Sequence, residues 1–487
     1  MSRPLTAEDL YRIEFAENPQ ITPDGTHIAY VVVAFDRPSY EYRRTIWVVE
    51  TATGVTRQFT AGPNDSSPAW SPDGTRLAFV RGAARPIKPK NTEERERGVG
   101  RPQLCVLPAD GGEARQLTWH RYGVGHPVWS PDGASLAYEA ATGHADDAEA
   151  DDAMLDGKNV PAVRTITQLW YRADGEGWHY ERRRHLFVIG ADGGVPRQVT
   201  DGDWDDSSPA WSPDGRRLAF TSDRTDERWR VLGSDIWTLD LASGTLDRVT
   251  DGTLHCGAAA WSPDGARLAF SASPRDARGG HVDLYVAAAR GEPAAHPLTL
   301  DLVPTWSDTC INDLRAGHGP ALPYWSADGR EIICAASTQG TTHVYAVPYA
   351  GGEPRALTSG ACHVTAFSLD AARRTLALAI SHPTVPGEVY AQPADASAPA
   401  RQLTTLGAPL AEEVAFAQPE SITFAGADGW DVQGWLIRPP HVPAGARVPA
   451  VLQVHGGPHM MYGCSFFFEF QLLAARGYAV IYTNPRG

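Results

Sequence analysis

The residues best suited to chemistry lie near the C-terminus, in the run His455-Gly456-Gly457-Pro458. Glycines let a backbone approach a ligand closely, so N–H groups in such a loop can face the negative oxygen that develops during acyl transfer. Alone, the run is a weak motif, because glycine turns follow many strands. Its place directly after the apolar run from Pro449 to Val454 favours an oxyanion loop at the end of a buried strand.

No nucleophile accompanies this loop. The serine that would use it normally sits on a GxSxG turn, and that pattern does not occur in these 487 residues. The nearest match is Gly463-Cys464-Ser465, where Phe467 occupies the place of the second glycine, so we interpret Ser465 as structural. Since an oxyanion loop without a nucleophile cannot form an acyl-enzyme, the chain as given is expected to be inactive.

The elements around the loop alternate between strand and helix. After about Ala411 the sequence predicts a hairpin, a buried strand, the Gly-rich loop, a helix and a second buried strand, which is an α/β order. The expected ranges are 421–424 and 432–437 for the hairpin, 449–454 for the first buried strand, 466–475 for the helix and 478–482 for the second buried strand, followed by Asn484-Pro485-Arg486-Gly487.

The rest of the chain is a repeat. A small residue, then Pro or Ala, then Asp-Gly recurs between apolar strands, and a Thr ends each unit; such turns predict hairpins. The turns begin at Thr22, Ser71, Ser130, Ser212, Ser262, Ser326 and, in a worn SLDA copy, Ser368; the units end at Thr60, Thr118, Thr200, Thr250, Thr299, Thr358 and Thr404. Seven units of four short strands predict an all-β, seven-bladed β-propeller.

Three segments depart from the repeat. Residues 6–9 carry a capping signature, which predicts a helix from about Ala7 to Phe15. Residues 81–98 and 141–184 are insertions; the acidic run from Asp146 to Asp152 is read as a solvated loop, with a metal site as the alternative. The cluster Arg182, Arg183 and Arg184 either faces a peptide carboxylate or is a charged surface.

Composition excludes several classes of protein. A net charge of −15 argues against nucleic acid and anionic membranes as partners. The six cysteines are scattered without a CxxC pair, which favours buried free thiols over a zinc site or disulfides. We expect no metal and no cofactor, since no HExxH pattern occurs. The N-terminus lacks an apolar signal region and no run is long enough to span a membrane, so a cytoplasmic protein is expected.

The repeat, HGGP and NPRG in this order resemble the prolyl oligopeptidase family of serine peptidases. The acylaminoacyl-peptidase branch is most similar, with WSPDG-type blades and a stretch like DGEGWHYERRRHLFV. The resemblance implies an N-terminal helix (1–18) that packs on the hydrolase domain, a propeller (19–412) that admits only short peptides, and the first part of an α/β-hydrolase domain (413–487). By the same resemblance Gly456 and Gly457 form the oxyanion element, His455 shapes it, and the Ser, Asp and His of the triad lie beyond Gly487.

The leading hypothesis is therefore a serine peptidase for short peptides, of which this chain is the N-terminal part. Two alternatives remain: a non-catalytic propeller that binds peptides or proteins, and an esterase, since esterases use the same kind of oxyanion loop. A homo-oligomer is possible.

Overall fold

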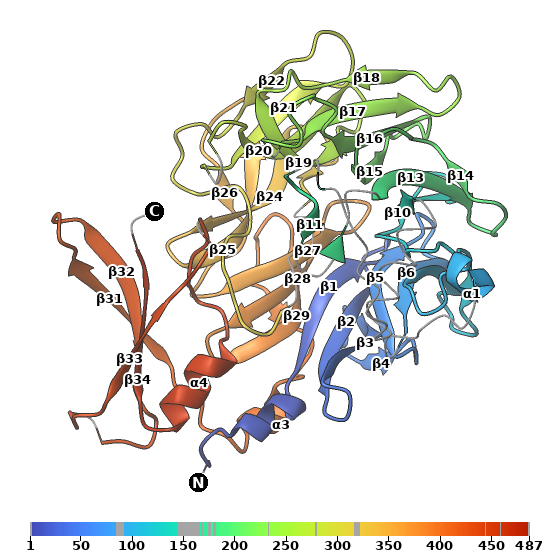
Figure 1. Ribbon diagram of the computed structural model, residues 1–487. Helices are drawn as coiled ribbons and strands as arrows, with labels where there is room; N and C mark the ends of the chain where they lie inside the picture. The colour runs from blue at the N-terminus through green and yellow to red at the C-terminus, as the bar shows by residue number, and fades with distance from the viewer. Residues whose placement is uncertain are drawn as a thin grey trace. The chain divides into compact units, whose positions relative to one another are not determined.

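The computed structural model describes residues 2–83, 92–143, 166, 169–173, 177–178, 182–231, 233–277, 280–315, 322–443, 445–457 and 459–485. The described chain consists mostly of short antiparallel strands (Figure 1). It divides into two compact units. One contains Met1–Thr75, Gly279–Leu284 and Leu298–Gly487, and the other contains Arg76–Arg278 and Tyr285–Pro297. The acidic run 146–152 lies outside the described residues. Among those described, no helix has the length and apolar character needed to cross a membrane.

In the unit that begins at Arg76, each sheet is built from strands that are near neighbours in the sequence. The first strands are β6 (Arg76–Gly82), β7 (Gln103–Pro108) and β8 (Arg115–Gln116), with α1 (Thr92–Glu96) between β6 and β7. The next sheets contain β9 (Val128–Trp129), β10 (Ser135–Gly143), β13 (Arg182–Gly190) and β14 (Arg197–Gln198); β15 (Asp206–Trp211), β16 (Arg217–Ser222), β17 (Asp235–Asp240) and β18 (Leu246–Arg248); and β19 (Leu254–Trp261), β20 (Arg267–Pro274), β21 (Asp283–Ala288) and β22 (Ala295–Pro297). A separate pair joins β11 (Arg172–Ala173) to β12 (Gly177–Trp178).

The other unit holds both ends of the chain. Its N-terminal part contains η1 (Ala7–Arg12), β1 (Glu14–Ile21), β2 (His27–Asp36), β3 (Glu41–Glu50), β4 (Thr56–Gln58) and β5 (Asn64–Trp70). Its later part contains β23 (Tyr324–Trp325), β24 (Glu331–Thr338), β25 (Thr341–Pro348), β26 (Arg355–Ala356), β27 (His363–Leu369), β28 (Thr375–His382), β29 (Val385–Pro393), β30 (Arg401–Gln402) and α3 (Ala408–Ala411).

The threonine that ends each repeat makes the same hydrogen bond in all seven copies. Its Oγ1 accepts a bond from a backbone N–H of the third strand, over 2.8 to 3.1 Å. The pairs are Thr60 with Ile46, Thr118 with Leu104, Thr200 with Leu186, Thr250 with Ile236, Thr299 with Leu284, Thr358 with Val344 and Thr404 with Val389. These threonines are buried, so each satisfies an N–H that would otherwise lack a partner.

The Asp-Gly turns also share one geometry. In six copies the hydroxyl that opens the turn donates to the aspartate two residues later, over 2.5 to 2.7 Å. The glycine then takes a positive φ, as at Gly215 with φ 68°, which side chains disfavour. The worn copy differs because its fourth residue is not glycine, and Ser368 Oγ instead accepts the N–H of Ile21 over 3.0 Å.

The N-terminal helix is shorter than predicted. Instead of a helix to Phe15, the structure has the single 3₁₀ segment η1, and β1 begins at Glu14 and pairs with β2. The capping signature is real, since Asp9 accepts hydrogen bonds from the N–H and hydroxyl of Thr6. Antiparallel pairing with β2, from Glu14 opposite Ala34 to Ile21 opposite Ile28, favours the strand over further helix. Arg12 forms an ion pair with Glu413, so this segment lies against the start of the C-terminal region.

The C-terminal region is a four-stranded mixed sheet with one helix. Its strands lie in the order β31 (Pro419–Ala425), β32 (Asp431–Ile437), β34 (Ala479–Asn484) and β33 (Ala450–Val454), and α4 (Phe468–Ala475) connects β33 to β34. The parallel pair β33–β34 and its connecting helix agree with the α/β order expected from the sequence.

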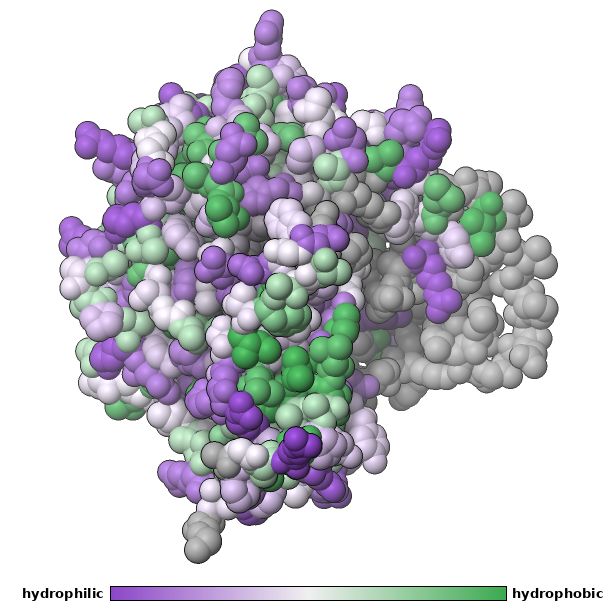
Figure 2. Space-filling view, turned by 90° about the vertical axis from the view of Figure 1, so that its left-hand side faces the viewer, coloured by the Kyte–Doolittle hydropathy of each residue, from purple (hydrophilic) through white to green (hydrophobic). Residues whose placement is uncertain are grey.

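The two faces of this sheet differ. On one face Trp435 and Tyr482 pack against Phe467 and Phe470 in a buried core. On the other, Leu452 and Val454 of β33 are 61% and 63% exposed. Figure 2 looks onto the side of the molecule where this sheet lies and shows apolar side chains gathered there.

Candidate functional site

The Gly-rich loop begins where β33 ends. Val454 is the last residue of the strand and pairs with Thr483 of β34, and His455, Gly456 and Gly457 follow directly. Both glycines are exposed, and within the described chain neither N–H donates a hydrogen bond. The loop therefore presents two open backbone donors at the carboxyl end of a parallel strand, the edge at which α/β sheets bind ligands.

Glycine is required at one of the two positions. Gly457 has φ 143°, and a Cβ added there would lie 3.3 Å from Met460 Cγ. At Gly456 an added Cβ would meet nothing within 4 Å, so the space in front of the loop is open. Pro458 lies outside the described residues.

His455 belongs to the wall of the loop. Its Nδ1 donates to the carbonyl of Gly456 over 2.9 Å, and its ring meets Tyr462 edge-on at 5.1 Å between centroids. Its Nε2 is buried and has no hydrogen-bond partner in the described part of the chain. These contacts give His455 a role in shaping the loop.

Asn484 holds the segment that follows the same loop. Its Oδ1 accepts the backbone N–H of Tyr462 over 2.8 Å, and its Nδ2 donates to the Tyr462 carbonyl over 3.0 Å. The Tyr462 ring then packs against Phe467, Phe470 and Tyr482. The asparagine of the NPRG motif thus holds the segment after the glycines, a role that the sequence analysis did not assign.

Helix α4 is capped from another part of the chain. Asp313 accepts the backbone N–H groups of Phe468 and Glu469 over 2.9 and 2.7 Å. Burial raises the pKa of this carboxyl, while the two N–H bonds act in the opposite direction. At the next turn, Gln471 bonds both the N–H and the carbonyl of Ala417. Polar contacts therefore fix the helix that follows the loop.

A second cluster surrounds Ser465. His363 lies between Ser465 and Asp308, with Nδ1 3.2 Å from Ser465 Oγ and Nε2 2.9 Å from the Asp308 carboxylate. This is the order of groups in a Ser-His-Asp triad. The His363 side chain is fully buried, however, and Ser465 is 4% exposed. A substrate cannot reach this hydroxyl, and the cluster instead ties β27 to the segment before α4.

The same cluster contains a set of metal-ligand types. Asp308, Cys310 and His363 each offer one ligand atom, and these atoms lie within 4.8 Å of one another. No sequence motif signals this group, because Asp308 and His363 are 55 positions apart. The prediction that the protein holds no metal stays a prediction.

The arginine cluster lies on β13. Arg183 is buried, pairs with Asp203 over 2.7 Å and covers the ring of Trp229. Arg182 lies over the Tyr122 ring, and the backbone N–H of Arg184 bonds Asp205. Alternation along the strand thus places Arg183 on the opposite face from its two neighbours.

The cysteines agree with the sequence prediction. All six are free and buried. Burial raises the pKa of Cys362 to about 11, so its thiol is protonated and unreactive near neutral pH.

No family model matches the chain. The peptidase YuxL of Bacillus subtilis (strain 168) is 34% identical to it over 489 residues, which cover 100% of this chain and 71% of YuxL. Dipeptidyl-peptidase 5 of Porphyromonas gingivalis is 24% identical over 504 residues, 99% of this chain and 68% of that protein.

Solved structures show the same fold. An acylaminoacyl peptidase in complex with Z-Gly-Gly-Phe-chloromethyl ketone matches 98% of this chain with a TM-score of 0.74 and 20% identity. A puromycin-hydrolyzing peptidase of Mycobacterium tuberculosis matches 99% with a TM-score of 0.67 and 17% identity. The chain spans 66% and 68% of the lengths of these two proteins.

Repeated small β-sheets followed by a glycine loop on a parallel strand pair define a β-rich chain with the fold of acylaminoacyl peptidases. With the similarity to YuxL over its whole length, the chain belongs to the prolyl oligopeptidase family of peptidases.

Proposed function

We propose that this chain supplies the substrate-selecting propeller and the oxyanion loop of a serine peptidase that acts on short peptides. The observation that carries the proposal is the pair of open N–H groups at Gly456 and Gly457, at the end of β33, in a chain 34% identical to a peptidase. Such donors stabilise the negative oxygen of the tetrahedral intermediate after a serine attacks the peptide carbonyl.

The lid in this proposal is a ring of seven blades over residues 19–412. Contact between the first and last repeats supports closure, since the N–H of Ile21 bonds Ser368. In addition, Ala16 and Ile28 share one buried cluster with Val389. A closed ring protects its sheet edges and leaves only a narrow entrance, which would admit short peptides and exclude folded proteins.

The hydrolase part in this proposal begins in residues 413–487. The exposed apolar side chains of Leu452 and Val454 support it, because sheets with parallel strands are normally covered on both faces. The triad serine, aspartate and histidine would lie on residues beyond this chain, and the 487 residues alone would not hydrolyse peptides.

Arg182 and Arg184 are the side chains of the arginine cluster that we propose for contact with a peptide carboxylate. Arg183 is less suited to this, since its side chain is buried on the opposite face of the strand. A guanidinium matches a carboxylate with two parallel hydrogen bonds, which suits recognition of a peptide terminus.

The loop is tested in the native gene product with Gly457→Ala. Alanine retains the N–H but disfavours φ 143°, so the loop should shift and kcat for a short acyl-peptide should fall by on the order of 10²–10³, with a small change in KM. Gly429→Ala is the matched control. This glycine also has a positive φ, 76°, but lies in the β31–β32 turn with nothing near its Cβ. An equal loss of kcat in the two variants would overturn the proposal. Hydrolysis of esters but not of peptides by the native gene product would also overturn it.

A further inference from the structure

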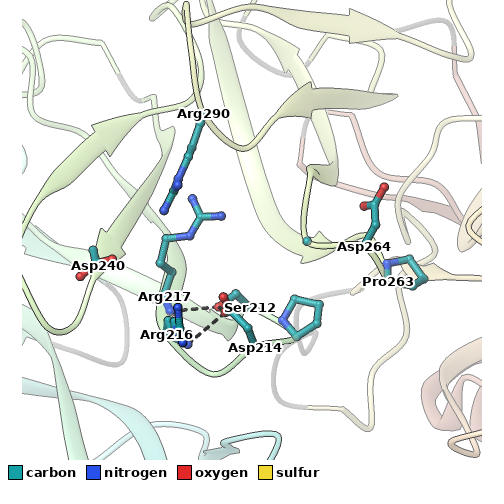
Figure 3. Close-up of a pocket in the computed structure, with 10 residues that line it drawn as sticks. Ser212, Asp214, Arg216, Arg217, Asp240, Pro263, Asp264 and Arg290 are labelled. Carbon is teal, nitrogen blue, oxygen red and sulfur yellow. Dashed lines mark hydrogen bonds between the residues drawn. The ribbon is translucent and has the colours of Figure 1, made fainter.

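A cavity of about 570 Å³ opens beside two Asp-Gly turns, those at residues 212–216 and 263–265. Arg217 of β16, Asp240 at the end of β17 and Arg290, just after β21, complete its lining. Figure 3 shows the two arginine side chains extending toward each other across this cavity. Its volume falls in the range of small-molecule sites, which is roughly 300–1,000 Å³.

Arg217 is held in place but poorly neutralised. It is 8% exposed, and its guanidinium lies 4.7 Å from the centre of the Trp261 ring. In the part of the chain that the structure describes, its guanidinium donates a single hydrogen bond, to the Ala289 carbonyl, which is long at 3.5 Å. In the described part of the chain, neither Arg217 nor Arg290 has a carboxylate within 4 Å.

Another junction between neighbouring sheets in the same unit has an acid that pairs with the equivalent arginine. There Arg76 lies over Trp129 at 5.1 Å, as Arg217 lies over Trp261, and it pairs with Asp192 over 3.3 Å. Just before Asp192, the N–H of Ala191 donates to the carbonyl of the residue that follows the Asp132-Gly133 turn, over 2.9 Å. Just before Arg290, the N–H of Ala289 donates in the same way to the residue that follows the Asp264-Gly265 turn, also over 2.9 Å. Asp192 and Arg290 therefore occupy equivalent places, and a cation stands where the other junction has an acid.

The acids near the cavity are engaged in their own turns. Asp214 accepts bonds from Ser212 and the N–H of Arg216, Asp264 accepts from Ser262, and Asp240 from Ser243. Asp214, Asp247 and Asp240 favour the charged form of Arg217, but burial and the charge of Arg290 outweigh them and lower the pKa of its guanidinium. Among the described residues, these acids therefore stabilise Arg217 only from a distance, and none forms an ion pair with either guanidinium.

We propose that this cavity binds a phosphate group, held between the guanidinium groups of Arg217 and Arg290. Each arginine offers parallel N–H donors that fit phosphate oxygens, and a dianion would neutralise both cations. The cavity is larger than a phosphate ion, so a small phosphate monoester fits better than the free ion. This binding would be independent of peptide hydrolysis.

The test is calorimetric titration of the 487-residue chain with inorganic phosphate and with adenosine monophosphate, in chloride buffer of matched ionic strength. Saturable binding of either phosphate compound is expected, and stronger binding of the monophosphate would identify the ester as the ligand. Arg290→Asp places an aspartate where the other junction has Asp192. Phosphate binding should weaken by at least about tenfold, since a charge-assisted hydrogen bond to the phosphate is lost and the new carboxylate repels it.

Arg230→Asp is the matched control. Arg230 is exposed and does not line the cavity, and this substitution changes the charge by the same amount as Arg290→Asp. It should bind like the wild-type chain. Melting curves without phosphate should show that both variants fold. Absence of saturable binding of both phosphate compounds, equal weakening in both variants, or equally strong binding of uncharged adenosine would overturn the proposal.

Discussion

The side chain of Asn484 holds the backbone of Tyr462 at both its N–H and its carbonyl, over 2.8 and 3.0 Å. These residues lie 22 positions apart, and the contact joins the end of β34 to the loop that follows the glycines. The position of the open N–H groups therefore depends on a side chain from another motif.

Asn484→Ala should loosen this loop. Loss of both bonds leaves two backbone groups of Tyr462 without a partner, at a cost of about 1–3 kcal/mol. Hydrogen exchange at residues 459–463 should accelerate. Gln453→Ala is the control, since in the described chain the Gln453 side chain bonds only an exposed carboxylate, that of Glu469. An unchanged rate of hydrogen exchange in the Asn484 variant would show that the two bonds to Tyr462 do not position the loop.

Thr250→Val tests the threonine of the repeat. Valine keeps the shape but leaves the Ile236 N–H and the Asp235 carboxylate without the Thr250 hydroxyl. The free energy of unfolding in urea should fall by about 1–3 kcal/mol. Thr56→Val, at an exposed position of β4, should change it by less than about 0.5 kcal/mol. Similar effects of the two substitutions would refute this role.

The turn aspartates predict a loss of stability in acid. The hydrogen bond from Ser262 lowers the pKa of Asp264. The serine that opens the turn lowers the pKa in the same way at Asp132, Asp214 and Asp328. A lowered folded pKa stabilises the fold above the unfolded value of about 3.9, and this contribution is lost as the pH falls through the folded pKa. The free energy of unfolding should therefore decline as the pH falls below about 5 and on through the lowered pKa values of these carboxyls. In Asp264→Asn the decline should be shallower; an unchanged slope would contradict the assignment.

The sequence predicted most of the elements because their signals are local. Asp-Gly turns and threonine ends depend on hydrogen bonds within one repeat, and each bound of the C-terminal strands and helix lies within two residues of its predicted position. The helix expected to reach Phe15 was wrong, because pairing of β1 with β2 outweighed the capping signal of Thr6 and Asp9.

The remaining features are long-range. Asp313 caps α4 from 155 positions away, and His363 meets Ser465 across 102 positions. Neither pair has a motif, so only the fold brings them together. The Arg217–Arg290 cavity also depends on residues far apart in the sequence. Its unusual charge becomes evident only when it is compared with the equivalent Arg76–Asp192 pair.

The central claim, that this chain is part of a serine peptidase, is tested most directly by the intact mass of the native gene product together with fluorophosphonate labelling. We predict a product heavier than 52.6 kDa that takes up the label, and an isolated 487-residue chain that does not. A native product of 52.6 kDa that stays unlabelled would contradict the claim and favour a propeller that binds its partners without catalysis.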